Sequence, residues 1–145
     1  QNVEKEEGTA GPQKLCLEIK FEGSPAVRGL CMGTGHSFAA LATAILAAFG
    51  WKENDVFSFH MDGEPYSTAA AHFYSRAAGK QPTADDHLLQ ELPWKKGQSF
   101  LLLYDYGNDH NFTVTVVSVE AGEGSEAVAE VQEMSVGTAP VQDDS

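Results

Sequence analysis

The stretch LCLEIKFEGSPAVRGLCMGTGHSFAALATAILAAFGW, residues 15–51, decides the fold, because its hydrophobic period changes from two residues to three or four. Residues 15–22 alternate apolar and polar side chains, which predicts a strand with one buried face. The turn-forming run Gly23-Ser24-Pro25 interrupts this pattern. Residues 27–32 are then expected to return as the second strand of an antiparallel hairpin.

A helix is predicted over residues 38–49. Ser37 is a good N-cap because its hydroxyl can accept a hydrogen bond from a first-turn amide. Gly50 suits the position just after the helix, where a left-handed conformation costs glycine little. The apolar residues form one stripe that would lie on a sheet, at Phe38, Leu41, Ala42, Ile45, Leu46 and Phe49.

The rest of the chain alternates short apolar runs with breaks. Period two resumes at residues 57–61, and Asp62-Gly63 predicts a tight turn. Residues 67–82 are interpreted as an insertion with one helical piece. Thr83, with Asp86 three residues on, is expected to start a short helix over residues 84–92. Two further strands are predicted at residues 98–106 and 111–120.

The element order is strand, strand, helix, strand, short helix, strand, strand. This order predicts an α+β fold with a mixed, mainly antiparallel sheet, one main helix packed on it, and a β-grasp-like arrangement. We expect a flexible lead at residues 1–13, a single domain at residues 14–120 and an acidic, disordered tail at residues 121–145.

The net charge is −12, and half of it comes from residues 121–145, which contain six acidic residues and no Lys or Arg. Binding to nucleic acid depends largely on neutralising phosphates, so this charge disfavours it. No apolar stretch reaches the roughly 20 residues that cross a bilayer, and no membrane span is expected. Cys16 and Cys31 form no CxxC motif. We expect two reduced thiols in a cytoplasmic protein, although the hairpin would bring them near each other.

The segment YDYGNDHNF, residues 104–112, is the most polar connection between two predicted strands. Asp105, Asp109 and His110 have the chemistry to bind a metal or transfer a proton. A turn explains the same residues more simply, because Gly, Asn and Asp tolerate positive φ angles. The turn is therefore the first interpretation, contact with a ligand or partner the second, and catalysis the third.

Two other residues are candidates for binding. His60 would share a strand face with Asp62, but no third ligand is close in sequence, so a solvated face is the simpler interpretation. Trp51 follows the helix end and is expected to cover the core, with an exposed aromatic anchor for a partner as the alternative. Neither residue is predicted to bind a metal.

Three motifs together resemble the plasmid Ri open-reading-frame-three-like family. They are AFGW at residues 48–51, FHMDGEPY at residues 59–66 and YDYG at residues 104–107. The resemblance covers roughly residues 14–120 and adds Arg28 and Tyr106 to the binding candidates. Asn108 and His110 stand where relatives show Asp and Trp. The resemblance implies no established reaction.

The sequence favours a non-enzymatic binding or protein-interaction module that has no cofactor and whose partner is an unknown protein. The alternative is a hydrolase or metal-dependent enzyme that uses Asp105, Asp109 and His110 or His60. A nucleic-acid accessory factor is a further, disfavoured alternative. No catalytic residue is predicted. The binding candidates are Arg28, Trp51, His60, Asp105, Tyr106, Asp109 and His110.

Overall fold

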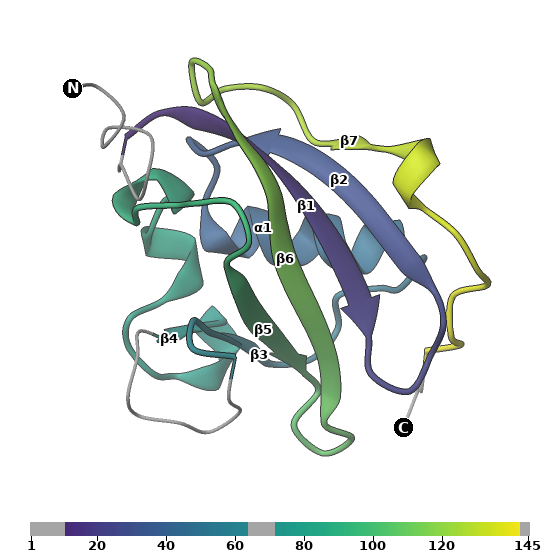
Figure 1. Cartoon of the computed structure of the whole chain (residues 1–145). Helices are drawn as coiled ribbons and strands as arrows, with labels where there is room; N and C mark the ends of the chain where they lie inside the picture. Colours follow the sequence, from purple (N-terminus) through teal and green to yellow (C-terminus); the bar gives the residue numbers. More distant parts are fainter. Residues whose placement is uncertain (1–10, 64–71, 143–145) are drawn as a thin grey trace.

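The computed structural model describes residues 11–63 and 72–142. Its strands are β1 (Gln13–Phe21), β2 (Val27–Gly33), β3 (Phe57–His60), β4 (His72–Tyr74), β5 (Ser99–Tyr104), β6 (His110–Ala121) and β7 (Ala129–Glu130). One α-helix, α1 (Phe38–Ala48), lies behind the sheet in Figure 1. Short 3₁₀ helices are η2 (Arg76–Ala78), η3 (Ala84–Asp86), η4 (Leu89–Glu91) and η5 (Gln132–Met134).

The predicted fold class is wrong. The strands form one seven-stranded sheet in the order β4-β3-β5-β6-β1-β2-β7, and every ladder between them is antiparallel. The fold is therefore mainly a seven-stranded antiparallel sheet, and not an α+β fold with a mixed sheet in β-grasp order. The error lies in the pairing. β6 is long enough to pair with β1 on one side and with β5 on the other, and the order of elements along the chain does not reveal such neighbours.

The core lies between α1 and one face of the sheet. Leu15, Leu17 and Ile19 point into it from β1 and are fully buried, as the alternating pattern predicted. Phe38 at the start of α1 stacks on Phe73 of β4, with ring centroids 4.1 Å apart. Among the largest fully buried side chains are also Trp94, Tyr104, Phe57, Phe59, Phe100 and Phe112.

The ends of α1 form as the sequence indicates. The Ser37 hydroxyl accepts a hydrogen bond from the Ala40 amide at 3.0 Å. Gly50 follows the helix with a φ of 75°, and the Trp51 amide donates back to the Leu46 carbonyl at 2.8 Å. These bonds fix the direction in which the chain leaves the helix and place Trp51 against the core.

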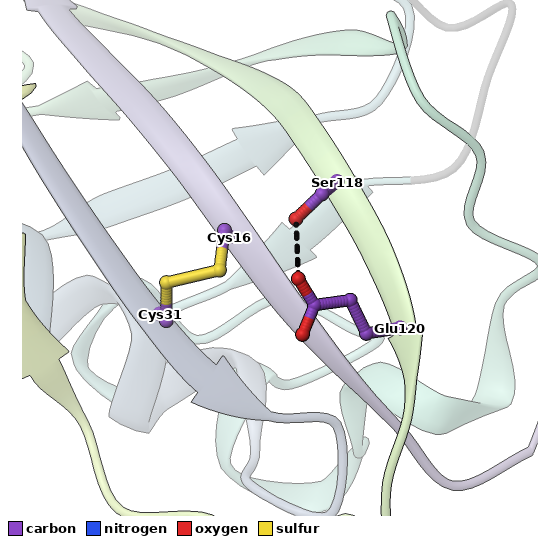
Figure 2. Close-up of a disulfide and its surroundings, with 4 residues drawn as sticks. All are labelled: Cys16, Cys31, Ser118 and Glu120. Atoms are coloured by element: carbon purple, nitrogen blue, oxygen red, sulfur yellow. Dashed lines mark hydrogen bonds between the residues drawn. A yellow bond between two sulfur atoms is a disulfide. The ribbon is translucent and has the colours of Figure 1, made fainter.

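The expectation of two reduced thiols is wrong. Cys16 of β1 and Cys31 of β2 stand directly opposite each other in the ladder, with Cα atoms 4.1 Å apart, and form a disulfide. Figure 2 shows the disulfide next to Ser118 and Glu120 of β6, whose side chains are hydrogen-bonded at 3.3 Å. The pairing register brings the two sulfur atoms together, and a register is not visible in the spacing of two cysteines.

The segment after β6 follows a defined course. We name residues 122–142 the C-terminal strap; it runs along the outer edge of β2 and contains β7 and η5 (Figure 1). This course differs from the disordered tail that the composition predicts for residues 121–145. Residues 143–145, and residues 1–10 of the expected flexible lead, lie outside the described residues.

The two intermediate segments also differ from expectation. Of the predicted insertion at residues 67–82, residues 67–71 lie outside the described residues, and the rest forms β4 and the short η2. The predicted helix at residues 84–92 is two 3₁₀ turns, η3 and η4. Thr83 makes no side-chain capping bond, whereas Glu91 accepts the Leu88 amide at 2.7 Å. Residues 84–92 therefore contain helical turns, but they do not form one continuous helix.

Candidate functional site

The connection at residues 104–112 is a tight turn held by hydrogen bonds among its own residues. Asp105 and Asp109 have φ angles of 63° and 52°, in the left-handed region that Asp tolerates better than most residues. The amides of Asn108 and Asp109 donate to the Asp105 carbonyl at 2.9 and 2.8 Å. The Asn108 side chain donates to the Asp105 carboxylate at 2.7 Å. These contacts support the turn interpretation.

Trp51 and His110 meet on the core side of the sheet. Their ring centroids are 5.0 Å apart, and Phe21 packs against both at 5.3 and 5.5 Å. Trp51 is 6% exposed, and its indole N–H donates to the Pro140 carbonyl at 2.8 Å. Trp51 is therefore buried, and its polar atom binds the C-terminal strap.

His60 and Tyr106 belong to a polar cluster on the sheet face away from α1. The Ser58 hydroxyl lies 2.7 Å from Nε2 of His60, and the His72 ring lies 4.4 Å from the His60 ring. Burial, reinforced by the proximity of His72, lowers the pKa of His60 to about 4. Burial also raises the pKa of Tyr106. Ser58 and His60 are 1% and 2% exposed, so this serine–histidine pair is closed to a substrate.

The seven sequence-predicted candidates do not converge on one site, although Trp51 lies against His110. Arg28 lies on β2, and His60 lies on β3, so that β1, β6 and β5 separate them in the sheet. Asp105 and Asp109 are held in the turn between β5 and β6. Within residues 11–63 and 72–142, no three His, Cys, Asp or Glu side chains are grouped to hold a metal ion. The same residues contain no helix long and apolar enough to cross a bilayer.

Arg28 joins three segments of the chain. Its Nε donates to the Ala48 carbonyl at the end of α1 at 3.1 Å. One terminal nitrogen donates to the carbonyls of Val27 and Val136 at 2.8 and 2.9 Å, and the guanidinium lies 5.4 Å from the centre of the Phe49 ring. Arg28 and Trp51, both suggested by the sequence, therefore share one role, which is to hold the C-terminal strap.

The C-terminal strap is bound to β2 by main-chain hydrogen bonds along its length. Val27 and Val136 exchange two bonds of 2.9 Å, and the Val131 amide donates to the Gly29 carbonyl at 2.8 Å. Farther along, β7 pairs with Leu30 and Cys31. Beyond it, the amides of Gly33 and Gly35 donate to the carbonyls of Glu126 and Gly124 at 3.0 and 2.7 Å. This is the pattern by which a sheet edge accepts an added strand.

Three glycines allow this close approach. A Cβ atom on Gly29 would lie 2.5 Å from Cβ of Met134, and one on Gly33 or Gly35 would collide with the Gly124 carbonyl. Any side chain at these positions would displace the strap. The β2 edge is thus shaped to fit an extended segment.

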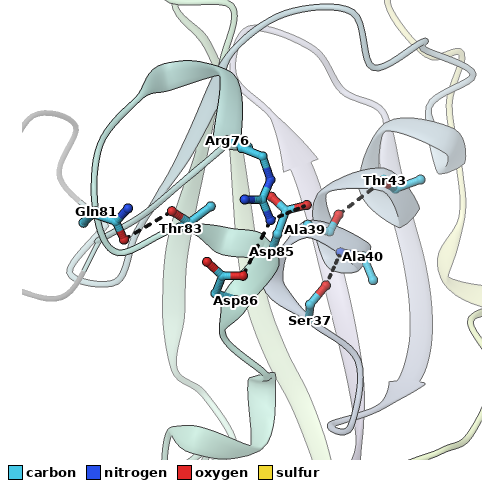
Figure 3. Close-up of polar contacts among 9 residues, drawn as sticks. All are labelled: Ser37, Ala39, Ala40, Thr43, Arg76, Gln81, Thr83, Asp85 and Asp86. Atoms are coloured by element: carbon cyan, nitrogen blue, oxygen red, sulfur yellow. Dashed lines mark hydrogen bonds and ion pairs between the residues drawn. The ribbon is translucent and has the colours of Figure 1, made fainter.

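Two surface hollows lie elsewhere. One of about 510 Å³ is lined by Glu53, Asp55, Arg76 and Asp85, among others. Figure 3 shows the Arg76 guanidinium between Asp85 and Asp86, at 4.0 and 3.5 Å. Such exposed pairs contribute little free energy. The other hollow, of about 490 Å³, is lined by Lys20, Glu22, Asn111 and Thr113 with Leu101. No binding candidate from the sequence lines either hollow.

Comparison with known proteins settles the family. The family model described as plasmid pRiA4b ORF-3-like protein matches residues 13–143. The chain belongs to this family. The crystal structure of a protein of unknown function, MM3350 from Methanosarcina mazei Go1, shares the fold with a TM-score of 0.69 and 17% identity. That match covers 89% of this chain and 72% of the other. No curated protein matches.

The motifs that indicated the pRiA4b ORF-3-like family have structural roles in this member. Gly50 follows the end of α1 with a positive φ, and Trp51 packs into the core. Gly63 turns the chain with a φ of 77°, and its amide donates to the His60 carbonyl at 3.0 Å. The Tyr104 hydroxyl accepts the Asn54 amide at 2.7 Å and lies 2.9 Å from the Lys52 carbonyl. The described residues of the three motifs therefore take part in turns and core contacts.

The residues that shape the β2 edge were not found from the sequence. Gly29, Gly33 and Gly35 all occupy odd-numbered positions in and just after a predicted strand, with Cys31 between the first two. Glycine in a strand interior weakens it and marks a close approach by another backbone. That signal was available, but it does not reveal which segment of this pRiA4b ORF-3-like protein makes the approach.

Proposed function

We propose that the protein is a non-enzymatic protein-interaction module that binds an extended peptide segment along the edge of β2. The observation that carries this proposal is the C-terminal strap itself. It lies along the edge through main-chain bonds, with Arg28 and Trp51 holding its far end by side-chain bonds to Val136 and Pro140. An edge that already accepts one extended segment can accept another by strand addition.

The strap is only loosely tied to the core. No strap residue is among the buried hydrophobic residues, and Val128, Val136 and Val141 are 42%, 56% and 90% exposed. Elements held mainly by surface hydrogen bonds open at a lower free energy than core elements. Opening of the strap would expose the free N–H and C=O groups of β2 without unfolding the sheet.

The other functional classes have less support. A hydrolase that uses Asp105 and Asp109 would need their carboxylates free for a substrate, whereas Asp105 accepts the Asn108 amide within the turn. The Ser58–His60 pair is enclosed. For a nucleic-acid accessory factor, the charge of −12 is unfavourable.

A peptide-binding experiment tests the proposal. A fluorescent peptide copying residues 122–142 is titrated with the full chain and with the variants Val131→Pro and Val136→Pro, read by fluorescence anisotropy. Each variant removes an amide that donates to β2 and weakens only the strap. We expect both variants to bind the peptide at least about tenfold more tightly than the unmodified chain, because the internal competitor is weakened.

The control is Val141→Pro, which changes a 90% exposed strap position. It should bind the peptide no better than the unmodified chain. Circular dichroism and urea unfolding verify that each variant is folded. Absence of binding to both folded strap variants would refute the proposal.

The cytoplasmic location expected from the sequence remains part of the proposal. The Cys16–Cys31 disulfide stands against it, because disulfides are rare in proteins of the reducing cytosol. Alkylation of the protein in intact cells, followed by mass measurement, distinguishes the two states. Alkylation of both cysteines would support the cytoplasmic location. A protein with neither cysteine alkylated would contradict it.

A further inference from the structure

The C-terminal strap leaves an apolar hollow unfilled beside the edge it occupies. This hollow, of about 160 Å³, lies between α1 and β7 and is lined by Leu30, Ala44, Ala47, Ala48, Val128 and Glu130. Three of the six residues are alanines of α1. Val128 reaches this hollow and is still 42% exposed.

We infer that the natural occupant of the β2 edge is an acidic, extended segment of another protein, with a larger apolar residue where the strap has Val128 and an unbranched one where it has Met134. This inference rests on the proposed function and names the partner class. Three independent features of the edge define this chemistry: its charge, the contact over Gly29 and the unfilled hollow.

Charge is the first feature. Residues 122–142 contain Glu123, Glu126, Glu130 and Glu133 and no Lys or Arg. The receiving side has cationic groups along the same path. Arg28 donates to the Val136 carbonyl. The ammonium of Lys14 also acts on the Glu126 carboxylate. Opposite charges across an interface speed association and reject basic segments.

The contact over Gly29 is the second feature. A Cβ on Gly29 would lie 2.5, 3.0 and 3.1 Å from Cβ, Cε and Sδ of Met134, so the whole Met134 side chain lies along this bare backbone. A flexible, unbranched chain can adopt this course. A β-branched residue has a second γ atom and is restricted at χ1, so it fits less well.

The hollow explains how a partner displaces the strap. The strap is tethered to its site and so has a high effective concentration. An identical segment from a second copy makes the same contacts and gains nothing over it. A partner must therefore bind better, and a larger apolar side chain at the Val128 position would do so by filling the space against Ala44 and Ala47.

The test uses the full-length Val136→Pro variant and four fluorescent peptides. The reference copies residues 122–142; the others carry Val128→Leu, Met134→Val, or Gln at all four glutamates. We expect the Val128→Leu peptide to bind about fourfold more tightly, the gain for one buried methylene. The Met134→Val peptide should bind more weakly. The Gln peptide should bind more weakly and lose the dependence on salt.

A matched change on the protein isolates the hollow. Ala47→Leu, added to the same variant, fills the space from the α1 side. It should remove the advantage of the Val128→Leu peptide and preserve binding of the reference. Val131→Pro provides a second background if Val136→Pro is poorly folded.

The outcomes separate the two proposals. If no peptide binds to the folded variants, the proposed function fails and this inference fails with it. If all four peptides bind equally, the edge binds peptides but the inferred partner chemistry is wrong. If the Val136→Pro variant forms a dimer in light scattering that the reference peptide dissociates, the occupant is a second copy and the inference is overturned.

Discussion

Acidification from pH 7.5 to 5 should destabilise this protein through one histidine. His60 has a pKa of about 4 in the folded protein, against 6.5 for an exposed histidine. Burial is the main cause, the neighbouring His72 of β4 lowers the value further, and Asp62 opposes the shift. The Ser58 hydroxyl also lies 2.7 Å from Nε2 of His60.

The sign and size follow from linkage. Between pH 6.5 and 4 the unfolded chain binds a proton at His60 that the folded protein does not, so stability falls as the pH is lowered through this window. At pH 5 the loss is about 2 kcal/mol, and below pH 4 it approaches a limit of about 3 kcal/mol. Above pH 6.5 the full stability is present.

Urea unfolding at pH 7.5 and pH 5 measures this loss. The variant His60→Gln removes the titrating group, so its free energy of unfolding should change by about 2 kcal/mol less between the two pH values. Val141→Ala, which changes a 90% exposed position that does not titrate, should keep the pH dependence of the unmodified chain. An identical pH dependence in His60→Gln and the unmodified chain would refute the assigned burial of His60.

Three further predictions concern stability and are measured by urea unfolding. The double variant Cys16→Ser, Cys31→Ser should lose about 3 kcal/mol of unfolding free energy, because the disulfide joins residues separated by 15 positions in the sequence. The unmodified chain with its disulfide reduced should have the same stability as this variant. Trp94→Ala should lose about 3–5 kcal/mol, since this fully buried indole fills the core and donates to the Leu89 carbonyl, whereas Val141→Ala should cost almost nothing. Tyr104→Phe should lose about 1–2 kcal/mol by leaving the Asn54 amide without its acceptor, and an unchanged midpoint would contradict that bond.

Local patterns predicted the individual elements well. Alternation at residues 15–22 identified β1, and Ser37 with Gly50 delimited α1 almost to the residue. Such signals depend on neighbours within one turn or one strand. The turn at residues 104–112 could be predicted for the same reason. Gly, Asn and Asp favour turns through their own backbone preferences, which do not depend on distant residues.

Pairing between distant segments could not be predicted in the same way. β1 lies between β2 and β6, and nothing in a single strand states its partners. The disulfide depends on the register that sets Cys16 against Cys31. The role of Arg28 depends on Val136, more than 100 residues away in sequence. The spatial partners of the candidate residues could not be predicted from the sequence.

The C-terminal strap shows how an acidic segment with few apolar residues can follow a defined course. A segment with few apolar residues is expected to be disordered because it cannot bury enough surface to offset its ordering entropy. Here a sheet edge supplies main-chain partners, which require no apolar side chains. The requirement on side chains lies instead in and just after β2. Gly29, Gly33 and Gly35 lack the Cβ atoms that would keep a second backbone away. Glycines on the same side of a predicted strand, as at Gly29 and Gly33, are therefore a sign that another backbone lies close to that edge.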